Sequence, residues 1–281
     1  MGGSLCIDGS PASLKRINIK SKMNSNIKMN WMKLILSFFA PLVLSVGATR
    51  AQEIASVAHR FVEREDMAQY IKREQDYWKP IAEKAIEDGR MSSWSVWQKI
   101  GGFNMDEEPN ILIYAEFDKI SDLELYSSTP TWKKVFPNKK FSDISVRGLF
   151  EAKAHLYQKP LVNMVSAGSV EMPEIIRINF VKAPGTLNEY LRLENEVWGA
   201  FVAEQIEKGS TNVTSWYLGQ VIEPGGLDRP YDAVTVDGFK SLAEALAPRY
   251  DEGVDMPDLS EFGKVHKKVK RHLYRLVAHA R

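Results

Sequence analysis

The sequence has almost none of the groups that cross-link a chain or carry thiol and metal chemistry. Its one cysteine, Cys6, lies in an N-terminal segment that we expect to be removed. The mature protein would then have no disulfide, no cysteine nucleophile and no cysteine metal ligand. A chain of 281 residues, 44% of them hydrophobic, must therefore be stabilised by its core.

Sequence motifs for metal, phosphate and serine hydrolase sites are also missing. The chain contains no HExxH pair, no glycine-rich phosphate loop and no GxSxG turn. The five histidines show no spacing that would place two metal ligands on one helix face. We therefore predict neither a metal site nor a bound cofactor. The histidines are His59, His155, His266, His272 and His279.

Positive charge is concentrated at the N-terminus, and the rest of the chain lacks a basic excess. Residues 1–51 hold seven of the 37 Lys and Arg residues and one of the 36 acidic residues. Residues 52–281 therefore carry 30 basic and 35 acidic side chains, a net charge of −5. Because nucleic-acid binding needs a basic face, we predict that nucleic acid is not a partner.

Residues 1–51 include the layout of a secretory signal peptide. Lys28 and Lys33 come before a mostly apolar run at 34–46, and small residues follow up to Ala48 and Ala51. The run is too short for a stable membrane span. We expect cleavage after Ala48 or Ala51 and a periplasmic or secreted protein. The alternative is a retained membrane anchor. With either outcome, a true start at Met23, Met29 or Met32 would make the preceding residues an over-called extension.

The rest of the chain contains one clear internal repeat. The segments 70–89 and 190–209 match at an offset of 120. In both, apolar residues recur at helical spacing, and a glycine stands where a left-handed residue ends a helix. Each copy therefore predicts a long amphipathic helix. The identical pairs are Tyr70/Tyr190, Glu74/Glu194, Trp78/Trp198, Ile86/Ile206, Glu87/Glu207 and Gly89/Gly209.

Strand patterns surround each predicted helix in the same order. Segments rich in β-formers lie at 54–62, 92–100 and 111–117 in the first half and at 174–182, 213–222 and 231–236 in the second. A shorter helical segment and a closing strand complete each half, so each reads β-α-β-β-α-β, the ferredoxin-like order. We predict the α+β class, with units at 52–170 and 171–281 whose sheets pair into one α/β barrel.

Two tandem ferredoxin-like units, each with a long first helix bearing Tyr and Trp, resemble the dimeric α/β barrel superfamily. That superfamily includes stress-responsive barrel proteins, NIPSNAP-type proteins, EthD-like proteins and antibiotic-biosynthesis monooxygenases. The resemblance covers residues 54–281 and implies facing sheets with helices outside, here closed within one chain. It implies no particular activity, because functions in the superfamily differ widely. Haem-handling relatives use a helix histidine near the pocket, and the segments around Leu123 and Leu242 have none.

Alternation along the strands predicts which side chains line the barrel. In the strand at 111–117, the apolar residues at every second position lie on the face opposite to Tyr114 and Glu116. If helices cover the apolar face of each sheet, the other face points into the barrel. The same rule, ambiguous only at the two His-Leu-Tyr tripeptides, selects residues from the other strands. The predicted ligand-binding residues are Trp97, Arg177, Asn179, Tyr217, Thr235, His155 and His272, and the catalytic candidates are Glu116, Tyr114 and His59.

Three functions are compatible with this lining. The first is the binding of a small, largely apolar molecule inside the barrel. The second is a cofactor-independent oxygenase or isomerase, in which Glu116 acts with Tyr114 or His59 in proton transfer. The third is a structural or interaction protein with a filled barrel. The first two require a cavity beside Glu116, and we expect His59 or Arg177 within reach of its carboxylate.

Overall fold

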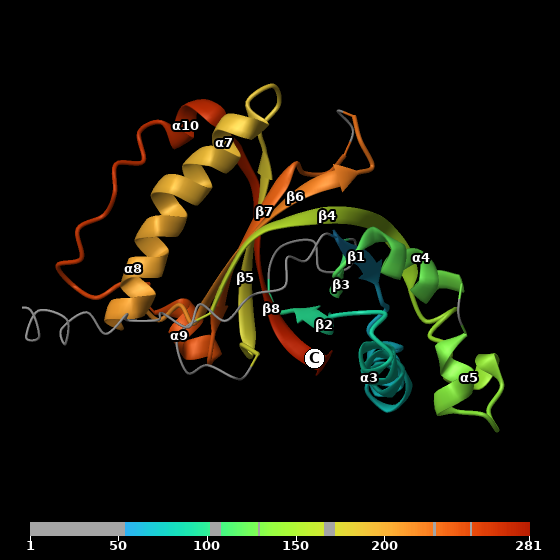
Figure 1. Cartoon of the computed structure of the whole chain (residues 1–281). Helices are drawn as coiled ribbons and strands as arrows, with labels where there is room; N and C mark the ends of the chain where they lie inside the picture. The colour runs from blue at the N-terminus through green and yellow to red at the C-terminus, as the bar shows by residue number, and fades with distance from the viewer. Residues whose placement is uncertain (1–53, 102–107, 129, 166–171, 227–228, 248) are drawn as a thin grey trace, which may run out of the picture. The chain divides into compact units, whose positions relative to one another are not determined.

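The computed structural model describes residues 54–101, 108–128, 130–165, 172–226, 229–247 and 249–281. Within these ranges eight strands close into one antiparallel barrel, in the order β1-β3-β2-β8-β5-β7-β6-β4 (Figure 1). The strands are β1 (Ile54–Phe61), β2 (Ser93–Lys99), β3 (Ile111–Phe117), β4 (Glu151–Val165), β5 (Ile175–Lys182), β6 (Ser215–Glu223), β7 (Ala233–Phe239) and β8 (Lys267–Ala280). A single chain therefore closes the barrel, as the sequence predicts.

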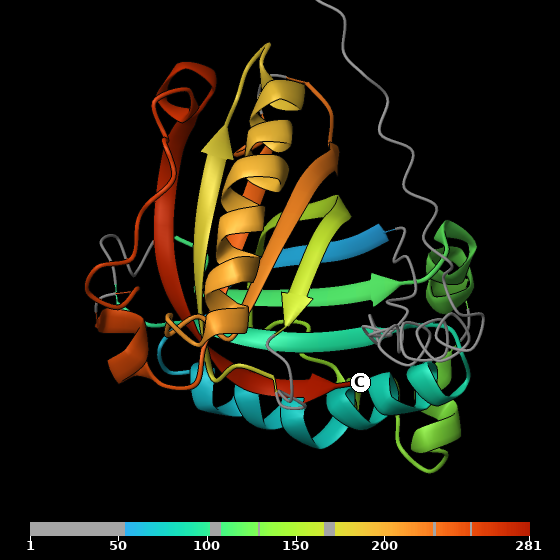
Figure 2. The same cartoon turned by 60° about the vertical axis from the view of Figure 1, so that its left-hand side comes forward.

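Each half of the barrel has the ferredoxin-like strand order. The first half is ordered β4-β1-β3-β2 and the second β8-β5-β7-β6. Two antiparallel joints connect the halves, one between β2 and β8 and one between β4 and β6. Figure 2 shows the two sets of strands crossing steeply, with one long helix lying over each set. The predicted α+β fold of paired ferredoxin-like units is confirmed.

The repeated segment forms a long helix in each half. The first consists of α2 (Met67–Arg73), η1 (Glu74–Trp78) and α3 (Lys79–Glu87), and the second of α7 (Leu187–Leu193), η2 (Glu194–Gly199) and α8 (Ala200–Lys208). Both η segments are π-helical turns that begin at the repeated glutamate. The helices are followed by glycines at φ +69° and +68°, the left-handed conformation expected of Gly89 and Gly209.

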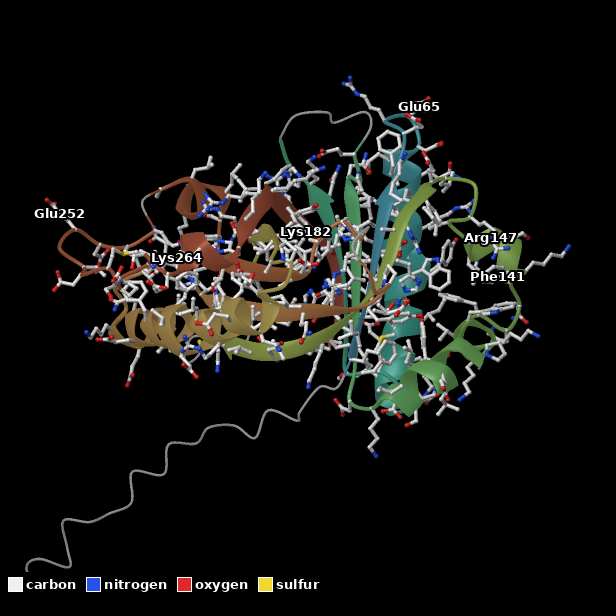
Figure 3. The ribbon with its side chains drawn as sticks, turned by 90° about the horizontal axis from the view of Figure 1, so that it is seen from above. Glu65, Phe141, Arg147, Lys182, Glu252 and Lys264 are labelled. Atoms are coloured by element: carbon white, nitrogen blue, oxygen red, sulfur yellow. The ribbon has the colours of Figure 1, made fainter. Side chains whose placement is uncertain are left out.

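Shorter helices complete the outer layer. In the first half these are α4 (Ile120–Ser128), α5 (Thr131–Val135) and α6 (Phe141–Ile144), and in the second they are α9 (Leu242–Leu246) and α10 (Phe262–Val265). Figure 3 shows Phe141 and Arg147 at the outer side of the first half, with Lys264 and Glu252 on the second. The Phe141 ring meets the edge of Trp78 at 6.4 Å between centroids, which ties α6 to the first long helix.

The core is divided between the inside of the barrel and its two outer faces. An inner cluster takes at least one buried side chain from every strand, for example Val57, Leu112, Ile178 and Tyr274. One outer cluster lies between the first long helix and its strands, and a second lies under the helices of the second half. The structure therefore has two cores outside the barrel wall and a third within it.

The predicted orientation of the side chains is correct in β1, β2 and β3 and wrong in β5, and also at His155 in β4 and Thr235 in β7. In β3 the apolar residues at 111, 113, 115 and 117 pack in the outer cluster, and Leu112 joins the inner one. In β5 the apolar residues Ile176, Ile178 and Phe180 face inward instead. The opposite face of β5 carries Arg177 and Asn179, which find hydrogen-bond partners in α9 and on the neighbouring strands. The assumption that helices always cover the more apolar face therefore fails there.

The predictions for residues 1–51 lie outside the described residues. Among the helices that the structure does describe, none combines the length and apolarity that crossing a membrane requires.

Candidate ligand-binding sites

The interior of the barrel holds a partly open cavity of about 160 Å³, here called the inner cavity. Its walls are mostly apolar and come from both halves, including Val57, Trp97, Ile176, Ile178, Phe180 and Val234. The cavity lies beside Tyr114 and Glu116, where the sequence predicts one. A volume of this size is close to that of an apolar cavity that holds one benzene ring. The barrel interior is therefore not completely filled by side chains.

A carboxylate cluster forms the polar wall of the inner cavity. The Tyr114 hydroxyl donates to Glu116 Oε1 at 2.7 Å, and the Ser93 hydroxyl donates to Oε2 at 2.7 Å. The strand register explains this arrangement, because Glu116 pairs with Ser93 across the β2–β3 ladder. Burial raises the pKa of Tyr114 well above its usual value, so its hydroxyl stays protonated as a donor. The predicted Tyr114–Glu116 pair is thus a hydrogen-bonded unit.

Tyr217 reaches the same wall from the second half. Its ring meets Tyr114 edge to face, with 5.9 Å between centroids. A glycine makes room for this ring: a Cβ at Gly219 would lie 2.6 Å from the Tyr217 hydroxyl and 3.0 Å from Gln158 Oε1. No side chain fits there without displacing a neighbour. Trp97 also points inward, as predicted, and donates through Nε1 to Ser95 at 2.8 Å.

His59 lies inside the barrel but far from Glu116. Its Nε2 is hydrogen-bonded to the Tyr231 hydroxyl at 2.8 Å, and its ring packs near Phe180. Glu116 pairs with Ala55, which is four residues earlier on β1, so the two backbones are about 13 Å apart. The expectation that His59 is within reach of the carboxylate is therefore wrong. Burial lowers the pKa of His59 to about 4, which keeps the imidazole neutral.

His272 takes up an inward position at one end of the barrel. Its backbone pairs with the inward-facing Ile178, and its ring lies 6.0 Å from that of Phe180. Its Nε2 lies 3.4 Å from Glu108, whose carboxylate also pairs with Lys99 and Lys270. His272 is not among the residues that line the inner cavity.

Four of the predicted ligand-binding side chains point out of the barrel instead of into it. The Arg177 guanidinium stacks on Phe239 and donates to the Ala245 carbonyl in α9. Asn179 donates to Thr235 at 3.0 Å and accepts from Arg271 at 2.8 Å. The Ala245 carbonyl lies in α9, whereas Thr235 and Arg271 lie on the neighbouring strands β7 and β8, so Arg177 and Asn179 find their partners on the outside of the barrel. Arg177 therefore cannot reach Glu116, and its predicted position is wrong.

His155 is the fourth side chain that points outward. It lies one position before Leu156, which belongs to the inner cluster, and it is hydrogen-bonded to the outward-facing Ser56 at 2.8 Å. Its ring packs on Tyr157 with 5.1 Å between centroids. His155 therefore lines a different hollow, on the outer face of the first half.

This second hollow, here called the outer cleft, has a volume of about 360 Å³. It lies between the outer face of the first-half strands and the helical segments η1 and α4. Its walls include the aromatic side chains of Trp78, Trp94, Tyr126, Phe150 and Tyr157. Its ionisable groups are Arg60, Glu74 and the two histidines His59 and His155, of which His59 also faces inward.

Arg60 and Glu74 form a partly buried ion pair in the outer cleft. Arg60 Nη1 donates to the Tyr70 hydroxyl at 2.7 Å and to Glu74 Oε1 at 3.2 Å. The guanidinium also lies 4.1 Å from the centroid of the Phe150 ring. Burial raises the pKa of Glu74 to about 6, although the charge of Arg60 opposes this. Burial and the nearby Arg60 charge lower the pKa of His155.

The sequence reasoning missed Arg60 and Ser93 as parts of these sites. Arg60 follows His59 directly, so alternation places it on the helix-facing side of β1, where an arginine needs a partner. That position was a usable signal. Ser93 gave no signal, because its role depends on the register that sets it opposite Glu116. Among the described residues, no group of three or more His, Cys, Asp or Glu side chains could hold a metal ion.

Comparisons with known proteins agree with this fold and supply no relative in sequence. Neither a family model nor a curated protein sequence matches the chain. Among solved structures, a "putative monooxygenase" from Lactobacillus acidophilus NCFM has a TM-score of 0.52 and 10% identity, covering 82% of this chain and 96% of its own. An anthrone oxidase-like protein reaches 0.49 and 13% identity over 82% and 94%. A chlorite dismutase from Candidatus Nitrospira defluvii reaches 0.43 and 10% over 81% and 92%. At such identities the likeness shows the fold alone.

Proposed function

We propose that the protein binds a small, largely apolar molecule inside the barrel. The observation that carries this proposal is the inner cavity of about 160 Å³, which a core packed to ordinary density would not leave. Its apolar walls suit a hydrocarbon body, and the Tyr114–Glu116–Ser93 cluster supplies a polar contact at one side. Pockets for small molecules commonly combine apolar walls with a few such polar groups.

The proposal is tested by ligand binding to wild-type protein and to a variant with a filled cavity. Small aromatic probes such as indole should raise the melting temperature in proportion to their occupancy. Val57→Phe places a ring in the inner cavity and should abolish this shift, whereas Ile222→Phe, at an exposed position, should leave it unchanged. Mass spectrometry of molecules that co-purify with the wild-type protein would then identify the natural ligand.

The polar cluster gives a second test of the same proposal. Glu116→Gln and Tyr114→Phe each remove one part of the hydrogen-bonded unit without changing its size. Both should weaken ligand binding while leaving the melting temperature nearly unchanged. If both variants instead lose several degrees and bind every probe as before, the cluster is a structural pair, which is the result that the filled-barrel hypothesis predicts.

A cofactor-independent oxygenase or isomerase is the second candidate function. The specific observation in its favour is the 2.7 Å hydrogen bond from Tyr114 to Glu116 at the cavity wall, a contact through which a proton can move. His59 is not available to this pair, because it is bonded to Tyr231. Only turnover separates this candidate from simple binding. Oxygen uptake or isomerisation that is lost in Glu116→Gln, with ligand affinity retained, would establish it.

A further inference from the structure

We propose that the outer cleft is a second binding site, which takes a small aryl-substituted organic acid and pairs its carboxylate with Arg60. This inference is independent of the inner cavity, since the two hollows lie on opposite faces of the same strands. The cleft is also the larger of the two, at about 360 Å³ against about 160 Å³.

The unpaired side of the Arg60 guanidinium indicates that the ligand of the outer cleft is an anion. The hydrogen bonds of Arg60 to Tyr70 and Glu74 both use Nη1, leaving Nε and Nη2 without a partner among the residues that the structure describes. These two nitrogens form the side-on pair that binds a carboxylate through two parallel hydrogen bonds. The side chain is 21% exposed, so a ligand in the cleft can reach it. The Phe150 ring holds the guanidinium plane from one side.

The walls of the cleft select the rest of the ligand. Trp78, Trp94 and Tyr126 present ring faces and edges around the space above Arg60. Aromatic side chains pack well against another ring, beyond the gain from burial alone. An acid with a single ring or a fused ring therefore matches both the charge and the walls, whereas a sugar acid or a phosphate ester would leave the aromatic surface unused.

The second half of the chain shows that Arg60 is not required to build the helix above the cleft. That half keeps the Tyr–Glu pair, with Tyr190 donating to Glu194 at 2.7 Å, and keeps the π-helical turn. Ile54 pairs with Phe117 across the β1–β3 ladder, and Ile175 pairs with Phe239 at the equivalent place in the β5–β7 ladder. Aligning the two halves on these pairs places Val181 at the position of Arg60. The same alignment places Arg177 at the position of Ser56, and its guanidinium occupies the outer face there. The charge at position 60 is thus specific to the half that has the open cleft.

The test compares phenylacetate with its neutral isostere phenylacetamide by calorimetry. Wild-type protein should bind phenylacetate at least about tenfold more tightly, since one charged hydrogen-bonded pair is involved. Arg60→Met should remove this preference. Because it also leaves Glu74 without its ion-pair partner, the double variant Arg60→Met/Glu74→Gln, which removes both charges, should give the same result if the single variant folds poorly. The matched control is Arg177→Met on the outer face of the second half, which should leave the preference intact.

Each possible result decides the inference. Equal binding of the two probes to wild-type protein, absence of binding, or a preference that survives in the double variant overturns it. Val57→Phe, which fills the inner cavity, should leave phenylacetate binding unchanged. If Val57→Phe abolishes it, the acid sits inside the barrel, and the outer cleft is not its site. Conversely, failure of every probe to bind the inner cavity, with phenylacetate still held by Arg60, would overturn the proposed function and leave this inference standing.

Discussion

The buried histidine His59 predicts a specific loss of stability in acid. It is 5% exposed, and it is neutral in the folded protein because burial lowers its pKa to about 4. In the unfolded chain the same group titrates near pH 6.5. Between these two values the unfolded chain binds more protons than the folded one, so the free energy of unfolding falls as the pH falls. The contribution is fully present above pH 6.5 and is lost progressively down to pH 4.

The magnitude follows from the two pKa values. For one group with values of 6.5 and about 4, the free energy of unfolding is roughly 2–3 kcal/mol lower at pH 4.5 than at pH 7.5. Gln in place of His59 can still bond to the Tyr231 hydroxyl but does not titrate. The variant His59→Gln should therefore lose roughly 2–3 kcal/mol less than wild-type protein over the same interval. Other titrating groups cancel in this difference.

Urea unfolding at several pH values between 4.5 and 7.5 measures the effect. Tyr231→Phe is the control, because it removes the hydrogen bond and keeps the imidazole buried. If burial is the cause, Tyr231→Phe should remain as sensitive to acid as wild-type protein. Two results would refute this prediction. One is an equal loss of stability in wild-type protein and His59→Gln between pH 7.5 and 4.5, and the other is a His59 imidazole resonance that titrates near pH 6.5 in the folded protein.

Three further predictions concern packing, assembly and processing. Gly219→Ala should destabilise the protein by about 1–3 kcal/mol, because its Cβ would overlap the Tyr217 hydroxyl, whereas Gly225→Ala, with open space around its Cβ, should cost almost nothing in urea unfolding. A fragment of residues 54–170 should self-associate in analytical ultracentrifugation, since it exposes the edges of β2 and β4 that pair with the second half; a stable monomer would contradict the paired-sheet interpretation. Protein exported by its host should begin after Ala48 or Ala51 on N-terminal sequencing, and an intact N-terminus would exclude a cleaved signal peptide.

The first half of the chain shows how much alternation alone can predict. Residues 111–117 have one face of Ile, Ala and Phe and another that carries Tyr114 and Glu116, so the two environments differ clearly. The structure places the first set under the helices and the second at the inner cavity. The internal repeat was equally informative, since it located both long helices and the glycines that end them.

The second half shows where the same rule fails. Ile176, Ile178 and Phe180 form the more apolar face of β5, but they point into the barrel rather than toward the helices. The outer side of β5 can carry a polar face because partners are present there, the Ala245 carbonyl of α9 for Arg177 and the Arg271 guanidinium of β8 for Asn179. Those partners lie 68 and 92 residues away along the chain, so no local sequence pattern predicts them.

The polar contacts inside the barrel are of the same kind. His59 and Tyr231 are 172 residues apart, and their hydrogen bond exists only because β1 and the segment before β7 face each other across the closed barrel. Composition and alternation specify which side chains can point inward. They do not specify which of these meet, nor how much space is left between them, because both depend on packing across all eight strands.

The divergence of the two halves argues that the chemistry of this protein belongs to the first. What the halves share, the Tyr–Glu pair, the π-helical turn and the terminal glycine, is what the helix needs in order to fold onto its sheet. At the positions that border the hollows, the halves differ. Ser93 and Ser215 are equivalent in the register, but Ser93 faces Glu116 whereas Ser215 faces Gly238, where a Cβ would lie 2.2 Å from its hydroxyl oxygen. A carboxylate at that second position would require the Ser215 hydroxyl and the Pro173 ring to move. A functional group that the duplicated scaffold accepts on one side and excludes on the other is not needed for folding, so substitution at Glu116 should affect binding before it affects stability.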